Sequence, residues 1–122
     1  MIEGFECETS PLTEYERETL LPIMVKCLEK HVGKKKAITN KKMREALALN
    51  GYKKVSSARI RKIINHIRIN GLIECLMATS YGYYITQDRC EMNDYIFSLK
   101  GRIEAIQAVL EAMIEQHDNM PS

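Results

Sequence analysis

The stretch that most constrains this chain is residues 56–71, which predict an amphipathic helix ending at a glycine. Its apolar residues follow the spacing of one helix face: Ile60, Ile63, Ile64 and Ile67. Ser56 or Ser57 can cap the first turn by accepting hydrogen bonds from free backbone N–H groups. Gly71 is the residue type that most often ends a helix in the left-handed conformation. The segment therefore predicts a helix that packs its isoleucines against a small core.

The opposite face of this helix is basic and carries amide groups. At 100° per residue it presents Ala58, Arg61, Lys62, Asn65 and Ile69, with Arg59, His66 and Arg68 on its flanks. No acidic residue interrupts the segment. Two interpretations remain open for a basic helix seen alone. It can be a solvated face, or it can be a surface that binds a polyanion.

Charge is distributed unevenly along the chain. Residues 1–25 hold one basic and six acidic residues, net −5, and residues 26–71 hold fourteen basic and two acidic residues, net +12. Residues 72–122 hold three basic and eight acidic residues, net −5. At 122 residues we expect one domain with room for an appendage. A basic middle between acidic ends indicates a local anion-binding surface.

Two further helices are predicted before the basic one. The first runs over residues 14–32, with Thr13 and Glu16 spaced as a capping box, a kink at Pro22 and a stop at Gly33. The second runs over residues 41–49 and is capped by Thr39 or Asn40. Ile38, just before it, is either a short extended residue or a staple.

A β-hairpin is predicted directly after the basic helix. Residues 72–77 are typical of a strand, residues 78–82 of a turn and residues 83–85 of a returning strand. Tyr83 and Tyr84 alternate faces, so one of them is expected in the core. Three helices followed by a hairpin is the winged-helix order. The predicted fold is therefore mainly α with a small β-hairpin, a winged helix-turn-helix plus a long C-terminal helix.

The last segment has a heptad pattern. Its apolar residues advance in steps of four and three over three heptads: Met92, Ile96, Leu99, Ile103, Ile106, Leu110 and Met113. Asp88 is a candidate cap. We expect a dimerisation helix, and a single helix laid across its own domain is the alternative. The predicted organisation is a loose arm over 1–12, a winged-helix domain over 13–87, this helix over 88–117 and a disordered tail over 118–122.

The chain resembles the small winged-helix proteins carried by phages and other mobile elements of anaerobic bacteria. The resemblance covers roughly residues 11–115, and its matching runs are residues 12–18, 37–41, 57–65, 67–68, 71–73 and 78–85. It implies a fold and a DNA-binding surface but no reaction. Similar proteins usually carry lysine or arginine at the tip of the wing, where this chain has Tyr81.

The residue types predict how such a surface would contact double-stranded DNA. Arginine and lysine can donate to guanine and asparagine can pair with adenine in the major groove, so the candidate base-reading residues are Arg61, Lys62, Asn65 and Ala58. Candidate contacts to the DNA backbone are Lys34, Lys35, Lys36, Lys41, Lys42, Lys53, Lys54, Ser57, Arg59, Arg68, Thr79, Ser80 and Tyr81. A homodimer through the last helix would read a roughly palindromic site.

Other chemistry is not indicated. The three histidines fall on different predicted helices, and there is no phosphate-binding glycine loop or zinc spacing, so no enzyme, cofactor or metal is expected. No apolar run approaches a membrane span, and no secretory signal is visible. We therefore expect a cytoplasmic protein with reduced thiols, in which Cys27 and Cys75 are small core residues.

Several functions compete at this point. The leading hypothesis is sequence-specific DNA binding, by a transcriptional regulator or a replication or excision accessory factor. The alternative is a winged-helix module for protein–protein interaction without nucleic-acid binding. Binding of RNA or single-stranded DNA through tyrosine stacking ranks lower, because only Tyr81 is expected to be exposed. An enzyme ranks last.

Overall fold

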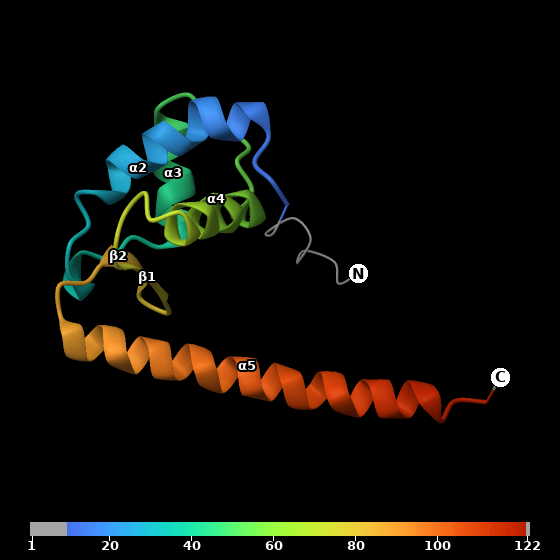
Figure 1. Ribbon diagram of the computed structural model, residues 1–122. Coiled ribbons are helices and arrows are strands. Elements are labelled where there is room, and N and C mark those ends of the chain that lie inside the picture. The colour runs from blue at the N-terminus through green and yellow to red at the C-terminus, as the bar shows by residue number, and fades with distance from the viewer. Residues whose placement is uncertain (1–9, 122) are drawn as a thin grey trace. The chain divides into compact units, whose positions relative to one another are not determined.

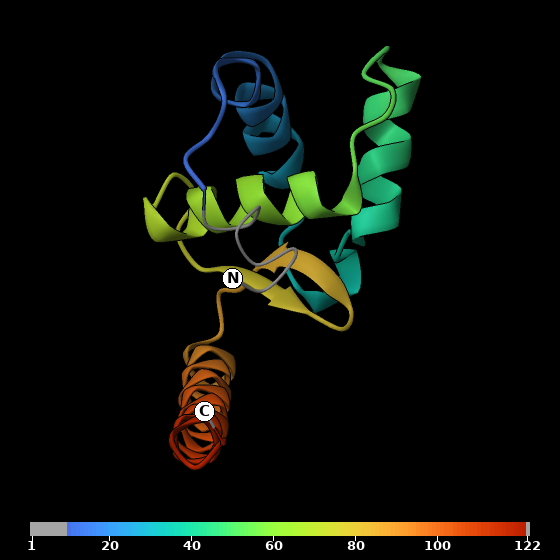
Figure 2. The ribbon, with the colours of Figure 1, turned by 90° about the vertical axis from the view of Figure 1, so that its right-hand side faces the viewer.

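The computed structural model describes residues 10–121 as two compact units, one ending at Gln87 and the other beginning at Asp88. The first unit holds five helical segments and a two-stranded antiparallel hairpin, and the second holds one long helix (Figure 1). Within the first unit, α4 (Ser57–Ile69) lies between the N-terminal helix and the hairpin (Figure 2). Of the predicted arm, only residues 10–12 fall inside the described range.

The N-terminal helix begins with the predicted capping box. The Thr13 N–H donates to Glu16 Oε1 at 2.8 Å, and the Glu16 N–H donates to Thr13 Oγ1 at 3.2 Å. A π-helical segment, η1 (Glu16–Leu20), then leads into α2 (Leu21–Leu28). Pro22 is thus placed in the first turn of α2, where its missing N–H costs least. At the place where the sequence predicts a kink, the helix changes from a π-helix to an α-helix.

The first helix ends earlier than predicted, at Leu28 instead of Val32. The backbone around the expected last residues pairs with the hairpin instead. The Ile85 N–H donates to the His31 carbonyl at 2.8 Å, and the Gly33 N–H donates to the Ile85 carbonyl at 2.9 Å. Because these backbone groups bond to a strand far along the chain, a local reading of helix periodicity could not place the end.

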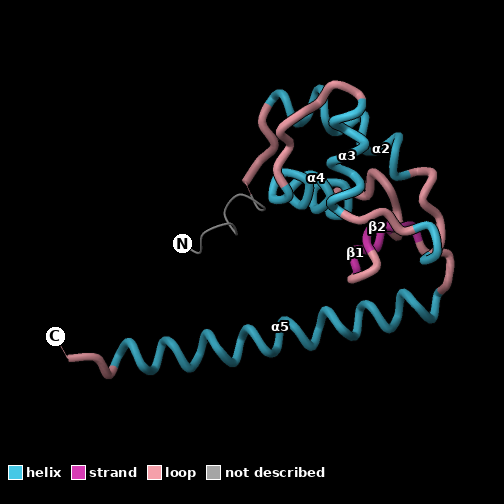
Figure 3. The backbone as a smooth tube through the Cα atoms, turned by 180° about the vertical axis from the view of Figure 1, so that it is seen from behind, coloured by secondary structure: helices cyan, strands magenta, loops and turns pink. Residues whose placement is uncertain are grey.

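The second and third helices have the predicted caps. In α3 (Asn40–Leu49), Thr39 Oγ1 accepts from the Lys42 N–H at 3.2 Å. In α4, Ser56 Oγ accepts from the Arg59 N–H at 3.1 Å. The short turn η2 (Lys34–Lys36) precedes α3, and an irregular loop connects α3 to α4 (Figure 3).

The hairpin consists of β1 (Leu76–Thr79) and β2 (Gly82–Ile85), joined by the two-residue turn at Ser80 and Tyr81. The prediction of a strand from residue 72 is wrong. Residues 72–75 form bends and turns instead, and Cys75 has a left-handed φ of 62°, which interrupts extended backbone.

Ile38 adds a third, very short piece to this sheet. Its N–H donates to the Tyr83 carbonyl at 3.0 Å, and its carbonyl accepts from the Tyr83 N–H at 2.8 Å. Of the two options for Ile38, the extended residue is therefore confirmed. Gly82 makes the approach possible, because a Cβ there would lie 2.6 Å from the Ile38 carbonyl oxygen.

The core sits between the helices and the hairpin. The four isoleucines of the predicted apolar face are 0–1% exposed, which confirms that face: Ile60, Ile63, Ile64 and Ile67. They pack with residues such as Met24, Met43 and Leu76. Tyr83 belongs to this core cluster and Tyr84 does not, as expected for alternating side chains, yet both are shielded from solvent at 8% and 2% exposed. They do alternate faces, but both faces of this short hairpin exclude solvent.

The second unit is a single helix, α5 (Arg89–Asp118). Asp88 Oδ1 accepts from the N–H groups of Cys90 and Glu91 at 2.9 and 3.4 Å, which confirms the predicted cap. No residue of α5 is buried. Over residues 10–121, no helix combines the length and apolar character needed to cross a membrane.

Candidate nucleic-acid interface

The exposed side of α4 carries part of the predicted basic face. Ala58, Arg61, Asn65 and Arg68 follow one another in steps of three, four and three along it. Arg61 is exposed, and the other three residues are half-buried. Arg61 Nη1 donates to Ser57 Oγ at 2.7 Å, so the first turn of the helix supports its guanidinium group.

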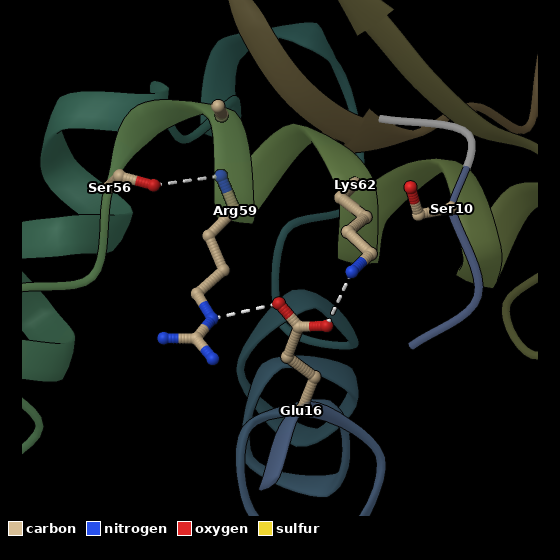
Figure 4. Close-up of a pocket in the computed structure, with 6 residues that line it drawn as sticks. Ser10, Glu16, Ser56, Arg59 and Lys62 are labelled. Atoms are coloured by element: carbon tan, nitrogen blue, oxygen red, sulfur yellow. Dashed lines mark hydrogen bonds and ion pairs between the residues drawn. The ribbon is translucent and has the colours of Figure 1, made fainter. Parts of the chain in front are cut away.

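Lys62 does not belong to this exposed side, and its placement there is corrected. Its side chain is turned toward the N-terminal helix and is 9% exposed. Lys62 Nζ donates to Glu16 Oε1 at 2.8 Å, and Arg59 Nε donates to Glu16 Oε2 at 2.8 Å (Figure 4). Because one carboxylate engages both cations, Lys62 as it stands cannot reach a base edge.

Glu16 is a functional candidate that sequence reasoning missed. Burial on its own would raise the pKa of Glu16, but the hydrogen bond from Lys62, with those from the Thr13 N–H and Arg59, holds it at about 2, below its ordinary 4.5. Glu16 is therefore ionised at neutral pH although it is only 3% exposed. The sequence predicts Glu16 only as part of the capping box, and nothing in the sequence joins it to residues 43 and 46 positions away.

A small cavity of about 300 Å³ lies beside this cluster, lined by Ser10, Glu16, Ser56, Ala58, Arg59 and Lys62 (Figure 4). Two cations and one carboxylate give its wall a net positive charge. The Arg59 side chain is 33% exposed, and its guanidinium carbon lies 5.2 Å from the centre of the Tyr15 ring. Its Nη atoms have no acceptor within residues 10–121, so Arg59 can still donate to an anion.

Asn40 ties the first turn of α3 to α4 and to the hairpin. Its Nδ2 donates to the Ser57 carbonyl at 3.1 Å and lies 3.3 Å from the Tyr83 hydroxyl. Its Oδ1 accepts from Arg44 Nε at 3.0 Å. One amide thus holds the first turn of α4 against two neighbouring elements, a role that the sequence suggested only as a possible cap.

The lysines of η2 lie beside the tip of the hairpin. All three are exposed, and Lys34 Nζ lies 4.3 Å from the centre of the Tyr81 ring, which is 59% exposed. Thr79 Oγ1 accepts from the Tyr81 N–H at 3.1 Å and Ser80 is exposed between them. The hairpin tip lacks a cation of its own, but η2 brings one to it.

The other predicted backbone contacts divide into two groups. Lys41, Lys42, Lys53 and Lys54 are exposed, the first two in the first turn of α3 and the others in the loop before α4. Arg68 is less available, because its Nε donates to the Leu76 carbonyl at 3.1 Å. The Ser57 hydroxyl accepts from Arg61, as described above.

On α5 the predicted dimer residues stay accessible. Met92 and Leu99 are half-buried, and the remaining five are 43–68% exposed: Ile96, Ile103, Ile106, Leu110 and Met113. Of the predicted core cysteines, Cys27 is half-buried and packs on the core, but Cys75 is exposed, so that prediction is wrong. Its left-handed backbone after α4 turns it away from the isoleucine face.

Within residues 10–121, no group of three histidine, cysteine, aspartate or glutamate side chains is placed to hold a metal ion. Compared with known proteins, the chain matches no family model, no curated protein and no solved structure.

Proposed function

We propose that this chain binds double-stranded DNA sequence-specifically as a winged-helix protein, with α4 entering the major groove. The exposed stripe of α4 supports the proposal most, because Ala58, Arg61 and Asn65 lie together there on a helix without acidic residues. An α-helix fits the major groove, where arginine recognises guanine and asparagine recognises adenine. Arg61 and Asn65 are the base-reading residues, and Ala58 makes apolar contact with a thymine methyl group.

Lys62 has a different part in this proposal from the one its position on the helix suggested. With Arg59 it forms the ion pairs to Glu16 that join α4 to the N-terminal helix. Lys62 is therefore a positioning residue that sets the orientation of α4. Arg59 lies at the edge of the cluster and contacts a phosphate through its remaining N–H groups.

Exposed lysines supply the affinity that does not depend on sequence. Lys41 and Lys42 in α3, and the three lysines of η2, are candidates for phosphate contacts. Each phosphate neutralised releases counterions, so the logarithm of the binding constant should fall with the logarithm of salt by about 0.9 per contact. Lys34 and Tyr81 act as one unit, in which the lysine gives the wing tip the charge that similar proteins carry on the wing itself.

A second copy covers the apolar stripe of α5 and doubles the site. Burying a leucine, isoleucine or methionine side chain contributes roughly 1.5–3 kcal/mol, so seven such residues per helix can support association. Two α4 helices then read half-sites of a roughly palindromic duplex. Such a site would suit a transcriptional regulator or a replication or excision accessory factor of a phage or mobile element. A monomer in sedimentation velocity at tens of micromolar would refute the dimer.

The test begins with selection from a random duplex library, followed by fluorescence anisotropy on the selected duplex. We expect steep salt dependence and a palindromic consensus. Arg61→Ala should weaken binding to the selected duplex by about 1–3 kcal/mol and relax the preference at one base pair. Lys34→Ala should weaken specific and non-specific duplexes equally and lower the salt slope by about 0.9.

The matched control is charge reversal at two exposed positions. Arg61→Glu and Lys26→Glu change the net charge equally, but Lys26 lies on α2, away from the stripe. Only Arg61→Glu should abolish binding to the selected duplex. Equal losses would mean that net charge alone drives binding, and no loss in either variant would show that α4 is not the reading helix.

A docking module for another protein is the second candidate. It is favoured by an open hollow on α2 that is lined by Leu21, Pro22, Val25, Lys26, Glu29 and Leu72, the last being 47% exposed. Exposed apolar surface of this kind marks interaction sites. Absence of duplex binding at low salt, together with one stoichiometric protein in a pull-down that Val25→Asp abolishes, would select this function over DNA binding.

A further inference from the structure

The apolar stripe of α5 is wider in its second half than in its first. In the heptad frame, Ile96, Ile103 and Leu110 occupy a positions, and Met92, Leu99, Ile106 and Met113 occupy d positions. Val109 then falls at g and Ile114 at e, and they are 60% and 51% exposed. The corresponding flanks of the first half are polar: Asn93, Tyr95, Lys100 and Arg102. Whatever covers α5 must therefore match apolar flanks at one end and polar flanks at the other.

We propose that the occupant is a second α5, parallel and in register. This proposal rests on the dimer of the proposed function and gives it a direction. In a parallel pair, each g residue contacts the e residue five positions further along the second helix. Val109 then meets Ile114 of the second copy, and Arg102 meets Gln107 of the second copy. Apolar flanks pair with apolar flanks, polar flanks pair with polar flanks, and no like charges meet.

The antiparallel pairing matches these residues poorly. Two antiparallel registers pair six of the seven a and d residues. One of them sets Lys100 against Lys100 and Arg102 against Arg102 of the second copy, so like charges meet. The other sets Ile103 opposite Ile106 of the second copy, so that facing a and d positions add up to 209. In antiparallel pairs g faces g and e faces e. Val109 then meets Arg102 of the second copy, and Ile114 meets Asn93 of the second copy. Both apolar flanks are placed against polar side chains.

Charge alone points the other way, but weakly. The second half of α5 carries Glu104, Glu111, Glu115 and Asp118, and a parallel pair brings these two acidic halves together. The three glutamates occupy b and f positions, on the side of the helix away from the stripe. Exposed charges separated by about a Debye length of 10 Å are largely screened. The flanking residues that the dimer would bury therefore decide whether the two helices run parallel.

Cysteine cross-linking of the full chain tests the direction. In a background of Cys7→Ser, Cys75→Ser and Cys90→Ser, His117→Cys and Met92→Cys each place a thiol at an end of the stripe. Parallel helices bring residue 117 beside its own copy, so His117→Cys alone should form a 117–117 disulfide in a glutathione buffer, identified by peptide mass mapping. Antiparallel helices would hold these thiols about 38 Å apart, at 1.5 Å per residue. Only a mixture of the two variants would then cross-link.

The outer-face variant Glu104→Cys is the matched control and should not cross-link in either arrangement. A 92–117 disulfide would overturn the parallel direction and leave the dimer and DNA binding standing. No cross-link, with a monomer in sedimentation, would overturn the pairing altogether. Loss of DNA binding with an intact 117–117 disulfide would refute the proposed function and leave this inference standing.

A second variant gives an independent answer without cysteines. Val109→Glu places a charge against Ile114 in the parallel pair and should weaken association at least tenfold in sedimentation equilibrium. Adding Ile114→Lys should recover most of that loss, because the new charges face each other. In the antiparallel pair, Val109→Glu alone would face Arg102 of the second copy and tighten association, which would overturn the proposal.

Discussion

The two helices α4 and α5 carry similar apolar stripes but differ in how far those stripes are buried. The isoleucines of the inward face of α4, Ile60, Ile63, Ile64 and Ile67, are 0–1% exposed, whereas Ile103 and Ile106 of α5 are 66% and 68% exposed. Periodicity predicted both stripes equally well. The difference is that the N-terminal helix, α3 and the hairpin supply apolar side chains to the core around α4, whereas no residue of α5 is buried. A stripe shows which face of a helix needs a partner, but it does not show where that partner is.

The largest effect should come from truncating the same residue type in both helices. Ile63→Ala removes side-chain atoms from a closed core and should lower the free energy of unfolding by about 2–5 kcal/mol. Ile103→Ala should leave the unfolding of the first unit unchanged and weaken self-association instead. Urea unfolding and sedimentation velocity measure the two quantities. Equal destabilisation by both variants would remove the distinction between the helices.

The next effect concerns the ion pairs that join α4 to the N-terminal helix. The folded-state pKa of Glu16 is about 2 and its ordinary value is 4.5, so this carboxylate stabilises the fold above pH 4.5. That contribution, about 3 kcal/mol, should be lost as the pH falls from 4.5 towards 2. Urea unfolding at a series of pH values measures it. Glu16→Gln should be less stable at pH 7 and should lose this acid dependence; an unchanged slope would show that other carboxylates cause it.

The smallest effect concerns α5, which has no buried residue. Gly101 lies inside α5, and an added Cβ would meet no atom within 4 Å. Gly101→Ala should stabilise α5 by about 1 kcal/mol and raise its helical content by circular dichroism. Gly82→Ala is the matched control and should be damaging, because its Cβ would clash with the Ile38 backbone. A loss of helix in Gly101→Ala would mean that a neighbour approaches α5 there.

What the sequence predicted well was local. The caps at Thr13, Ser56 and Asp88 depend on residues within one helical turn, and each was found where it was expected. The isoleucine face of α4 was also correct, since periodicity is a property of the helix itself. The predicted direction of an apolar face is therefore reliable even when the rest of the surface is not.

The features that the sequence could not predict depend on contacts between residues far apart in the chain. Lys62 lies nearly opposite the isoleucines on the helix, yet Glu16, 46 positions earlier, draws it out of solvent. The early end of α2 depends on Ile85, and the late start of β1 depends on the backbone of Cys75. Part of the predicted reading face thus became a structural contact. Arg61 and Asn65 remain accessible to solvent. The candidate interface on α4 therefore keeps these two residues and loses Lys62.

The bridge between Ile38 and Tyr83 has a consequence for how the chain is made. Forty-four residues separate these positions, so the edge of the sheet stays open on a growing polypeptide until β2 has left the ribosome. Until then the backbone N–H and carbonyl of Ile38 have only water to bond. A nascent chain stopped before Gly82 should therefore be sensitive to protease between α2 and α3, and one extended past Ile85 should be resistant.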